Sequence, residues 1–113
     1  MNDFRTPSTD ISDYGGHYEV IAKMPGIPKE DINIEVTPNS IEISANHEKD
    51  TEEQDKNWLR RERSNTSFYR SFGFPEQVKS EYIDAEFKDG ILMVHLPKIE
   101  PTTKHEEKTV KMK

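Results

Sequence analysis

The most constraining feature of this 113-residue chain is an Asp-Gly pair, Asp89-Gly90, set between two stretches of alternating apolar residues. A two-residue hairpin turn of the primed type needs positive φ at its central positions. Glycine adopts positive φ without steric cost, and aspartate tolerates it. The pair therefore predicts a tight β-hairpin, with one strand ending near Phe87 and the next beginning near Leu92.

Alternation of apolar and polar residues recurs along most of the chain, and its period of two is that of a β-strand. The clearest segments lie at 17–23, 32–36, 41–45, 68–74 and 83–96. Turn residues separate these segments, and none has convincing helical periodicity. Short strands at this spacing predict an all-β protein with an immunoglobulin-like antiparallel β-sandwich.

Two regions fall outside this pattern. Residues 46–57 are almost entirely polar, so we expect a solvated excursion there, followed at 58–63 by a short strand-like piece that starts with the only tryptophan. After Pro97 the chain is charged and aperiodic until Val110 and Met112. A tail of that composition buries too little apolar surface to order itself.

Composition limits the classes of function. Hydrophobic residues make up 31% and charged residues 34%, which favours an assembly that completes its cores between subunits. Cysteine is absent, so disulfides and thiol nucleophiles are excluded. The net charge of −6 disfavours nucleic acid and anionic lipid as partners. With no membrane-length apolar run and no signal-peptide pattern, we expect a cytoplasmic protein.

The residues give little support to an enzyme. The histidines are scattered and lack a metal-ligand spacing, so we expect no metal or other cofactor. In a chain that is one-third charged, paired carboxylates are more often solvated surface than an acid–base pair. We therefore expect a protein that is not an enzyme. The four histidines are His17, His47, His95 and His105.

Three features point to contacts with other chains. Arginines at 60–63 beside Trp58 would suit phosphate, but Glu62 interrupts them, and arginine and tryptophan are also favoured at protein interfaces. Arg70 shares a strand face with phenylalanines, which predicts a carboxylate partner across a dimer interface. In an extended tail, Val110 and Met112 would point to one side, a geometry that suits docking along a sheet edge.

We expect the tail to dock in a groove between two strands. The first strand supplies Ile32, Ile34 and Val36, and the second supplies Ile83, Ala85 and Phe87.

Residues 10–98 resemble the small heat-shock proteins, whose shared unit is the α-crystallin domain. The resemblance is carried by Ala85 to Leu92, Met24-Pro25-Gly26 with Lys29 to Ile32, Arg61-Glu62-Arg63, Phe68 to Phe72 with Pro75, and Pro97-Lys98. It implies an α-crystallin domain at 10–98. Residues 1–9 would be a short N-terminal arm, and 99–113 a flexible C-terminal extension with a Val-x-Met tail motif.

The polar excursion and its extra strand resemble the archaeal, bacterial and plant branch, in which that strand crosses into the sheet of a dimer partner. The resemblance places the exchanged strand, 58–61, against the partner's strand around 10–14. The implied dimer interface consists of Ile11, Trp58, Leu59, Arg60, Arg61 and Arg70.

The function implied by the resemblance is that of an ATP-independent chaperone, a holdase that binds partly unfolded client proteins and prevents their aggregation under stress. The implied assembly is a homodimer that builds larger homo-oligomers. A non-chaperone interaction module, or a co-chaperone of related sandwich fold, is the alternative, because a fold alone does not fix a function.

Overall fold

The computed structural model describes residues 2–5, 8–55 and 58–102. In this part of the chain, eight strands and one short 3-10 turn follow one another. They are β1 Asn2–Arg5, β2 Ser8–Asp13, β3 His17–Lys23, η1 Lys29–Asp31, β4 Ile32–Thr37, β5 Ser40–Asp55, β6 Trp58–Gly73, β7 Asp84–Lys88 and β8 Ile91–Pro97. No helix among the described residues has the length and apolar character needed to span a membrane.

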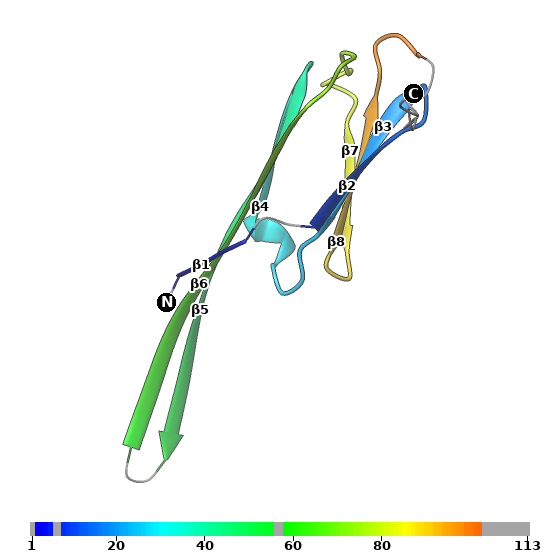
Figure 1. The fold of residues 1–113 in the computed structure, drawn as a ribbon. Helices are drawn as coiled ribbons and strands as arrows, with labels where there is room; N and C mark the ends of the chain where they lie inside the picture. The colour runs from blue at the N-terminus through cyan, green and yellow to red at the C-terminus, as the bar shows by residue number, and fades with distance from the viewer. Residues whose placement is uncertain (1, 6–7, 56–57, 103–113) are drawn as a thin grey trace, which may run out of the picture.

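The strands form two four-stranded sheets, one in the order β1-β6-β5-β4 and the other in the order β2-β3-β8-β7. The sheets lie face to face (Figure 1), which confirms the predicted all-β sandwich. Every ladder is antiparallel except that of β1, which runs parallel to β6 along Asn65 to Phe68. β2 begins at Ser8, within the segment expected to be an N-terminal arm.

Strand alternation builds the core between the sheets. On β3, Tyr18, Val20 and Ala22 are buried, and the β8 residues opposite them are buried as well. Burial of each such aliphatic side chain stabilises the fold by roughly 1.5–3 kcal/mol. The buried hydrophobic residues are Tyr18, Val20, Ala22, Met24, Ile27, Ile41, Ile43, Ala45, Phe68, Phe74, Val78, Leu92, Val94 and Leu96.

The predicted Asp-Gly hairpin is confirmed between β7 and β8. Asp89 has φ of 52° and Gly90 has φ of 76°, as a primed turn requires. The backbone N–H of Met24 donates to the carbonyl oxygen of Gly90 at 2.7 Å. A Cβ at Gly90 would lie 3.2 Å from the Cα of Pro25, so glycine also allows the turn to fit against the end of β3.

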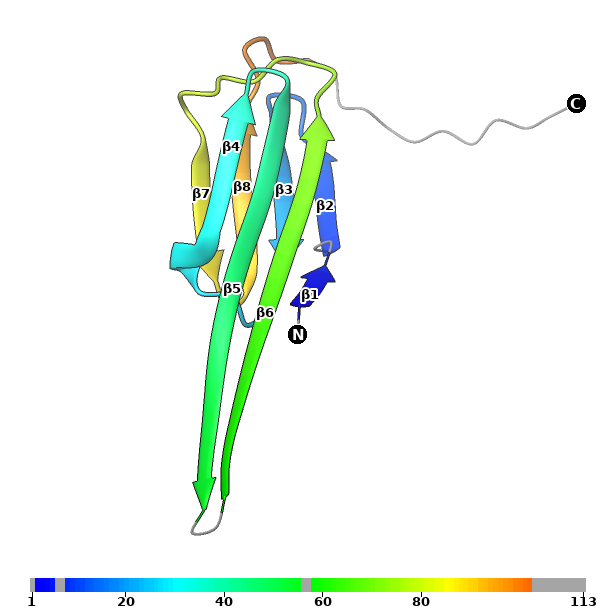
Figure 2. The same ribbon diagram turned by 90° about the vertical axis from the view of Figure 1, so that its left-hand side faces the viewer.

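The polar excursion is exposed, as expected, but its described residues are paired strand, and the piece after it begins a 16-residue strand rather than a short one. β5 continues to Asp55 and pairs with β6 in an unbroken antiparallel register, from Asn46↔Ser67 to Asp55↔Trp58. We call this paired extension, residues 46–55 and 58–67, the arm; it projects far beyond the sandwich (Figure 2). Most of its described side chains are exposed, so neither face is apolar and the sequence shows no alternation.

Candidate functional site: a groove, an arm and a sheet edge

A groove lies between β4 and β7, which are edge strands of different sheets on the same side of the sandwich (Figure 2). Its volume is about 140 Å³, close to that of an engineered cavity that holds one benzene molecule. Four of the six residues predicted for a groove line it, and the other two, Val36 and Ile83, do not. The lining residues are Lys29, Ile32, Ile34, Ala85, Glu86, Phe87 and Leu92.

The two walls follow from the positions of their strands. β4 alternates half-buried and exposed residues along its whole length, because only one neighbouring strand and the opposite sheet cover its inner face. On β7, Phe87 is half-buried and Ala85 is exposed, which leaves apolar surface open at the sheet edge. An edge strand also presents backbone donors and acceptors that no neighbouring strand occupies. The groove therefore offers apolar contacts and backbone hydrogen bonds together.

The arm carries the second surface. Trp58 and Leu59 lie at its far end and are 48% and 57% exposed. Exposed ion pairs run along it, with Arg61 Nη2 3.6 Å from Glu52 Oε2 and Arg63 Nε 3.1 Å from Asp50 Oδ1. The backbone of Arg60 pairs with that of Glu53. A two-stranded ribbon is marginally stable by itself, and exposed ion pairs add little to the stability of this one.

The third surface is the outer edge of β2. This strand pairs with β3 on one side, and no other described strand pairs with it on the other side. Ile11 lies opposite Val20 and shares its inward-facing side, yet it is 38% exposed because β2 closes the sheet. Tyr14, at the end of the strand, is 47% exposed. The edge is open both to backbone pairing and to apolar contact.

Arg70 lies on the inner face of β6, level with Ile43 of β5. Its guanidinium carbon is 4.4 Å from the ring centroid of Phe72, in a cation–π arrangement. Among the described residues of the single chain, no carboxylate pairs with Arg70. The carboxylate partner in a second subunit stays a prediction.

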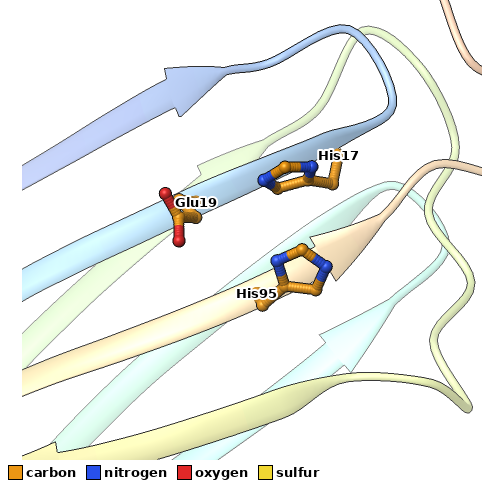
Figure 3. A group of neighbouring side chains, drawn as sticks. All are labelled: His17, Glu19 and His95. Atoms are coloured by element: carbon orange, nitrogen blue, oxygen red, sulfur yellow. The ribbon is translucent and has the colours of Figure 1, made fainter.

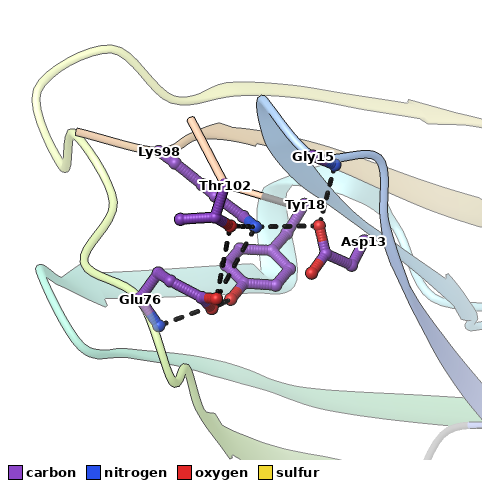
Figure 4. Close-up of polar contacts among 6 residues, drawn as sticks. All are labelled: Asp13, Gly15, Tyr18, Glu76, Lys98 and Thr102. Atoms are coloured by element: carbon purple, nitrogen blue, oxygen red, sulfur yellow. Dashed lines mark hydrogen bonds and ion pairs between the residues drawn. The ribbon is translucent and has the colours of Figure 1, made fainter. Parts of the chain in front are cut away.

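A buried polar cluster at one end of the sandwich was missed by the sequence analysis (Figure 4). Lys98 Nζ lies 2.9 Å from Asp13 Oδ1 and 4.0 Å from Glu76 Oε1, and it donates to Thr102 Oγ1 at 2.5 Å. The Tyr18 hydroxyl donates to Glu76 Oε2, and Lys98 lies 4.7 Å from the Tyr18 ring centroid. The cluster ties β2, β3 and the segment after β8 together.

Burial and the bond to Glu76 raise the pKa of Tyr18 to about 12. A lysine next to the end of a strand is ordinarily exposed, so the burial of Lys98 was not expected. No pattern in the sequence indicates that Lys98 meets Asp13 and Glu76, since both lie far from it along the chain.

The histidines are less scattered than the sequence indicated. The His17 and His95 ring centroids are 4.2 Å apart, and ligand atoms of His17, Glu19 and His95 lie within 4.8 Å of one another (Figure 3). Strand alternation places His17 and Glu19 on one face. The missing information was the pairing of β3 with β8, which brings His95 opposite Glu19. His47 instead lies 2.9 Å from Asp31, elsewhere on the molecule.

Residues 10–113 match the model of the "Hsp20/alpha crystallin family". Among curated proteins, small heat shock protein C4 of Rickettsia felis is 35% identical over 99 residues, which are 88% of this chain and 61% of that protein. The 18.1 kDa class I heat shock protein of Oryza sativa subsp. japonica is 42% identical over 81 residues, 71% of this chain and 50% of that protein. The chain thus spans about three fifths or less of the length of these relatives.

Among solved structures, heat shock protein 16.0 of Schizosaccharomyces pombe superposes with a TM-score of 0.69 at 25% identity. The superposition covers 95% of this chain and 99% of the yeast chain. The HspA protein of Xanthomonas axonopodis, 24% identical, has the same fold with a TM-score of 0.63 over 87% of this chain and 98% of its own.

Proposed function

The chain belongs to the Hsp20/alpha crystallin family, and we propose that it acts as an ATP-independent chaperone, a holdase that keeps partly unfolded proteins from aggregating. The relatives that it matches carry the name of heat shock proteins rather than of enzymes. We further propose that it works in the cytoplasm and that its chaperone action needs no cofactor.

The groove between β4 and β7 carries this proposal. Partly unfolded proteins expose apolar side chains and unpaired strand edges, and both drive aggregation. An extended client segment at the groove would bond to an edge backbone and place alternate side chains against Ile32, Ile34 and Phe87. The net charge of −6 favours solubility of the resulting complex.

The dimer that we propose forms by exchange of the arm. Residues 46–55 span roughly 33 Å at strand spacing, whereas a four-stranded sheet is about 15 Å wide. The arm is therefore long enough to cross a partner's sheet and pair Trp58 to Arg61 with the partner's β2. Exposure of Trp58 and Leu59 on the arm, and of Ile11 on the free edge, supports this pairing. Arg70 would face the same interface.

The tail motif, Val110 and Met112, lies outside the described residues. We propose that it docks in the groove of a neighbouring dimer and so links dimers into larger homo-oligomers. The groove volume fits one or two aliphatic side chains and is smaller than an ordinary drug-sized pocket. Tail and client would compete for one site, because both would be extended segments with alternate apolar side chains.

Light scattering tests the function directly. Malate dehydrogenase is heated with increasing amounts of the chain and no nucleotide, and scattering should fall as the chain is added, with ATP making no difference. An equal mass of an inert protein is the control. If the scattering curve is the same with the chain as with the inert protein, the holdase proposal fails and the interaction-module alternative takes its place.

A further inference from the structure

We propose that the outer face of the β2-β3-β8-β7 sheet binds one divalent transition-metal ion, Zn²⁺. His17, Glu19 and His95 would be its protein ligands. The site lies on the side of the sheet opposite the core, away from the groove. It is independent of the chaperone proposal, since none of the three residues lines the groove or lies on the arm.

Backbone geometry brings the three side chains together. His17 and Glu19 are two residues apart on β3, so both point to the outer face. Glu19 is the direct cross-strand partner of His95 on β8, and His17 lies diagonally from it. Both strands are central in their sheet, which holds the positions of these three residues firmly.

The side chains are arranged as ligands. Their ligand atoms lie within 4.8 Å of one another, and the two imidazole rings approach to 4.2 Å between centroids. A tetrahedral zinc site needs ligand atoms about 3.3 Å apart, a change that small χ rotations supply. All three side chains are half-buried rather than enclosed, so an ion can reach them.

Neighbouring groups orient the rings and add negative charge that favours a bound cation. Tyr14 stacks on His17, with centroids 5.0 Å apart and planes 15° from parallel, which restricts the orientation of that ring. Asp84 of β7 is the cross-strand partner of His95 on its other side, so His95 has a carboxylate residue opposite it on each neighbouring strand. Asp84 or water would complete the coordination.

The donor set selects the class of metal. Two imidazole nitrogens and one carboxylate suit Zn²⁺ and its transition-metal neighbours, whereas Mg²⁺ and Ca²⁺ prefer oxygen ligands alone. A metal held here would join β3 to β8 through side chains as well as through their backbone ladder. The expected consequence is a more stable sheet, because a ligand bound only by the folded state stabilises that state.

Isothermal titration with ZnCl₂ tests the site. The parent chain should bind one Zn²⁺ per chain, and MgCl₂ should give no binding. The double variant His17→Gln/His95→Gln should lose Zn²⁺ binding, and Glu19→Gln should weaken it at least about tenfold, since loss even of an outer-shell partner has that effect. His47→Gln is the matched control and should bind like the parent, because His47 lies apart from the cluster.

Thermal unfolding followed by circular dichroism supplies the second readout. Zn²⁺ should raise the melting temperature of the parent and of His47→Gln, and leave that of the double variant unchanged. The circular dichroism spectrum without metal should be the same in all variants, since the substituted side chains lie outside the core. The proposal is overturned if the parent takes up no Zn²⁺ at millimolar concentration, or if the double variant binds Zn²⁺ as tightly as the parent.

Discussion

Lys98 Nζ lies 2.9 Å from Asp13 Oδ1, and neither side chain is more than 9% exposed. Removal of the lysine would break this buried ion pair, which typically costs about 3–5 kcal/mol. We expect Lys98→Met to lower the free energy of unfolding by about that amount, as measured by urea denaturation. Arg63→Met is the matched control: its pair with Asp50 is 3.1 Å long but exposed, and its loss should cost less than about 1 kcal/mol. Equal losses in the two variants would mean that burial does not strengthen the Lys98 pair.

We expect the raised pKa of Tyr18 to make the folded chain less stable at alkaline pH. Its pKa is raised to about 12 in the folded chain, against the ordinary value of 10.0. The unfolded chain therefore loses this proton first, so the contribution is complete below about pH 10 and declines as the pH rises towards 12. Two pKa units correspond to about 2–3 kcal/mol. Tyr18→Phe should lose less stability than the parent over this range, as followed by urea unfolding at a series of pH values. Parallel curves for the two proteins would contradict the assignment.

The arm is expected to hold the dimer together. Replacement of residues 50–63 by Asn-Gly would close the β5–β6 ribbon directly after the Lys49↔Ser64 pair, with a turn that suits a hairpin. Sedimentation velocity should then show a folded monomer. The control Asp50→Asn/Arg63→Gln keeps the whole arm, removes one exposed ion pair, and should remain dimeric. A shortened chain that still sediments as a stable dimer would rule out exchange of the arm.

The groove and the tail are expected to form one contact between dimers. Ala85 is exposed and lines the groove, so Ala85→Glu should fill it without disturbing the core. This variant should sediment as dimers, and so should Val110→Ser/Met112→Ser. Burial of one apolar side chain is worth roughly 1.5–3 kcal/mol, and ordering of the tail offsets part of it, so each contact is weak. Lys88→Glu, on the same strand but outside the groove, should leave the large assembly unchanged. If both test variants also assemble like the parent, the tail does not dock there.

Strand alternation predicted the parts of the fold that have one buried face. The limits of β3 and the alternation of β4 follow from apolar residues at every second position. The turn between β7 and β8 follows from Asp89-Gly90. The arm could not be predicted in this way, because both of its faces are exposed and its strand character comes from pairing between β5 and β6. The polar clusters could not be predicted either, because they depend on contacts between distant parts of the chain: Lys98 with Asp13, and His95 with Glu19.

The two walls of the groove belong to different sheets, and this has a consequence for its response to heat. Backbone ladders hold β4 to β5 and β7 to β8, whereas no ladder among the described residues joins one sheet to the other, and their inner faces meet through side-chain packing. A fold opens locally first where few buried contacts hold its elements together. We expect the groove to widen on warming while both sheets persist, so that its width changes with temperature below the unfolding transition. The natural absence of cysteine allows spin labels at Asn33→Cys and Lys88→Cys to follow that width. If the distance between the two labels stays fixed up to global unfolding, the groove is rigid. If that distance grows at lower temperature, the contact between the two sheets is the part of the fold that responds to heat.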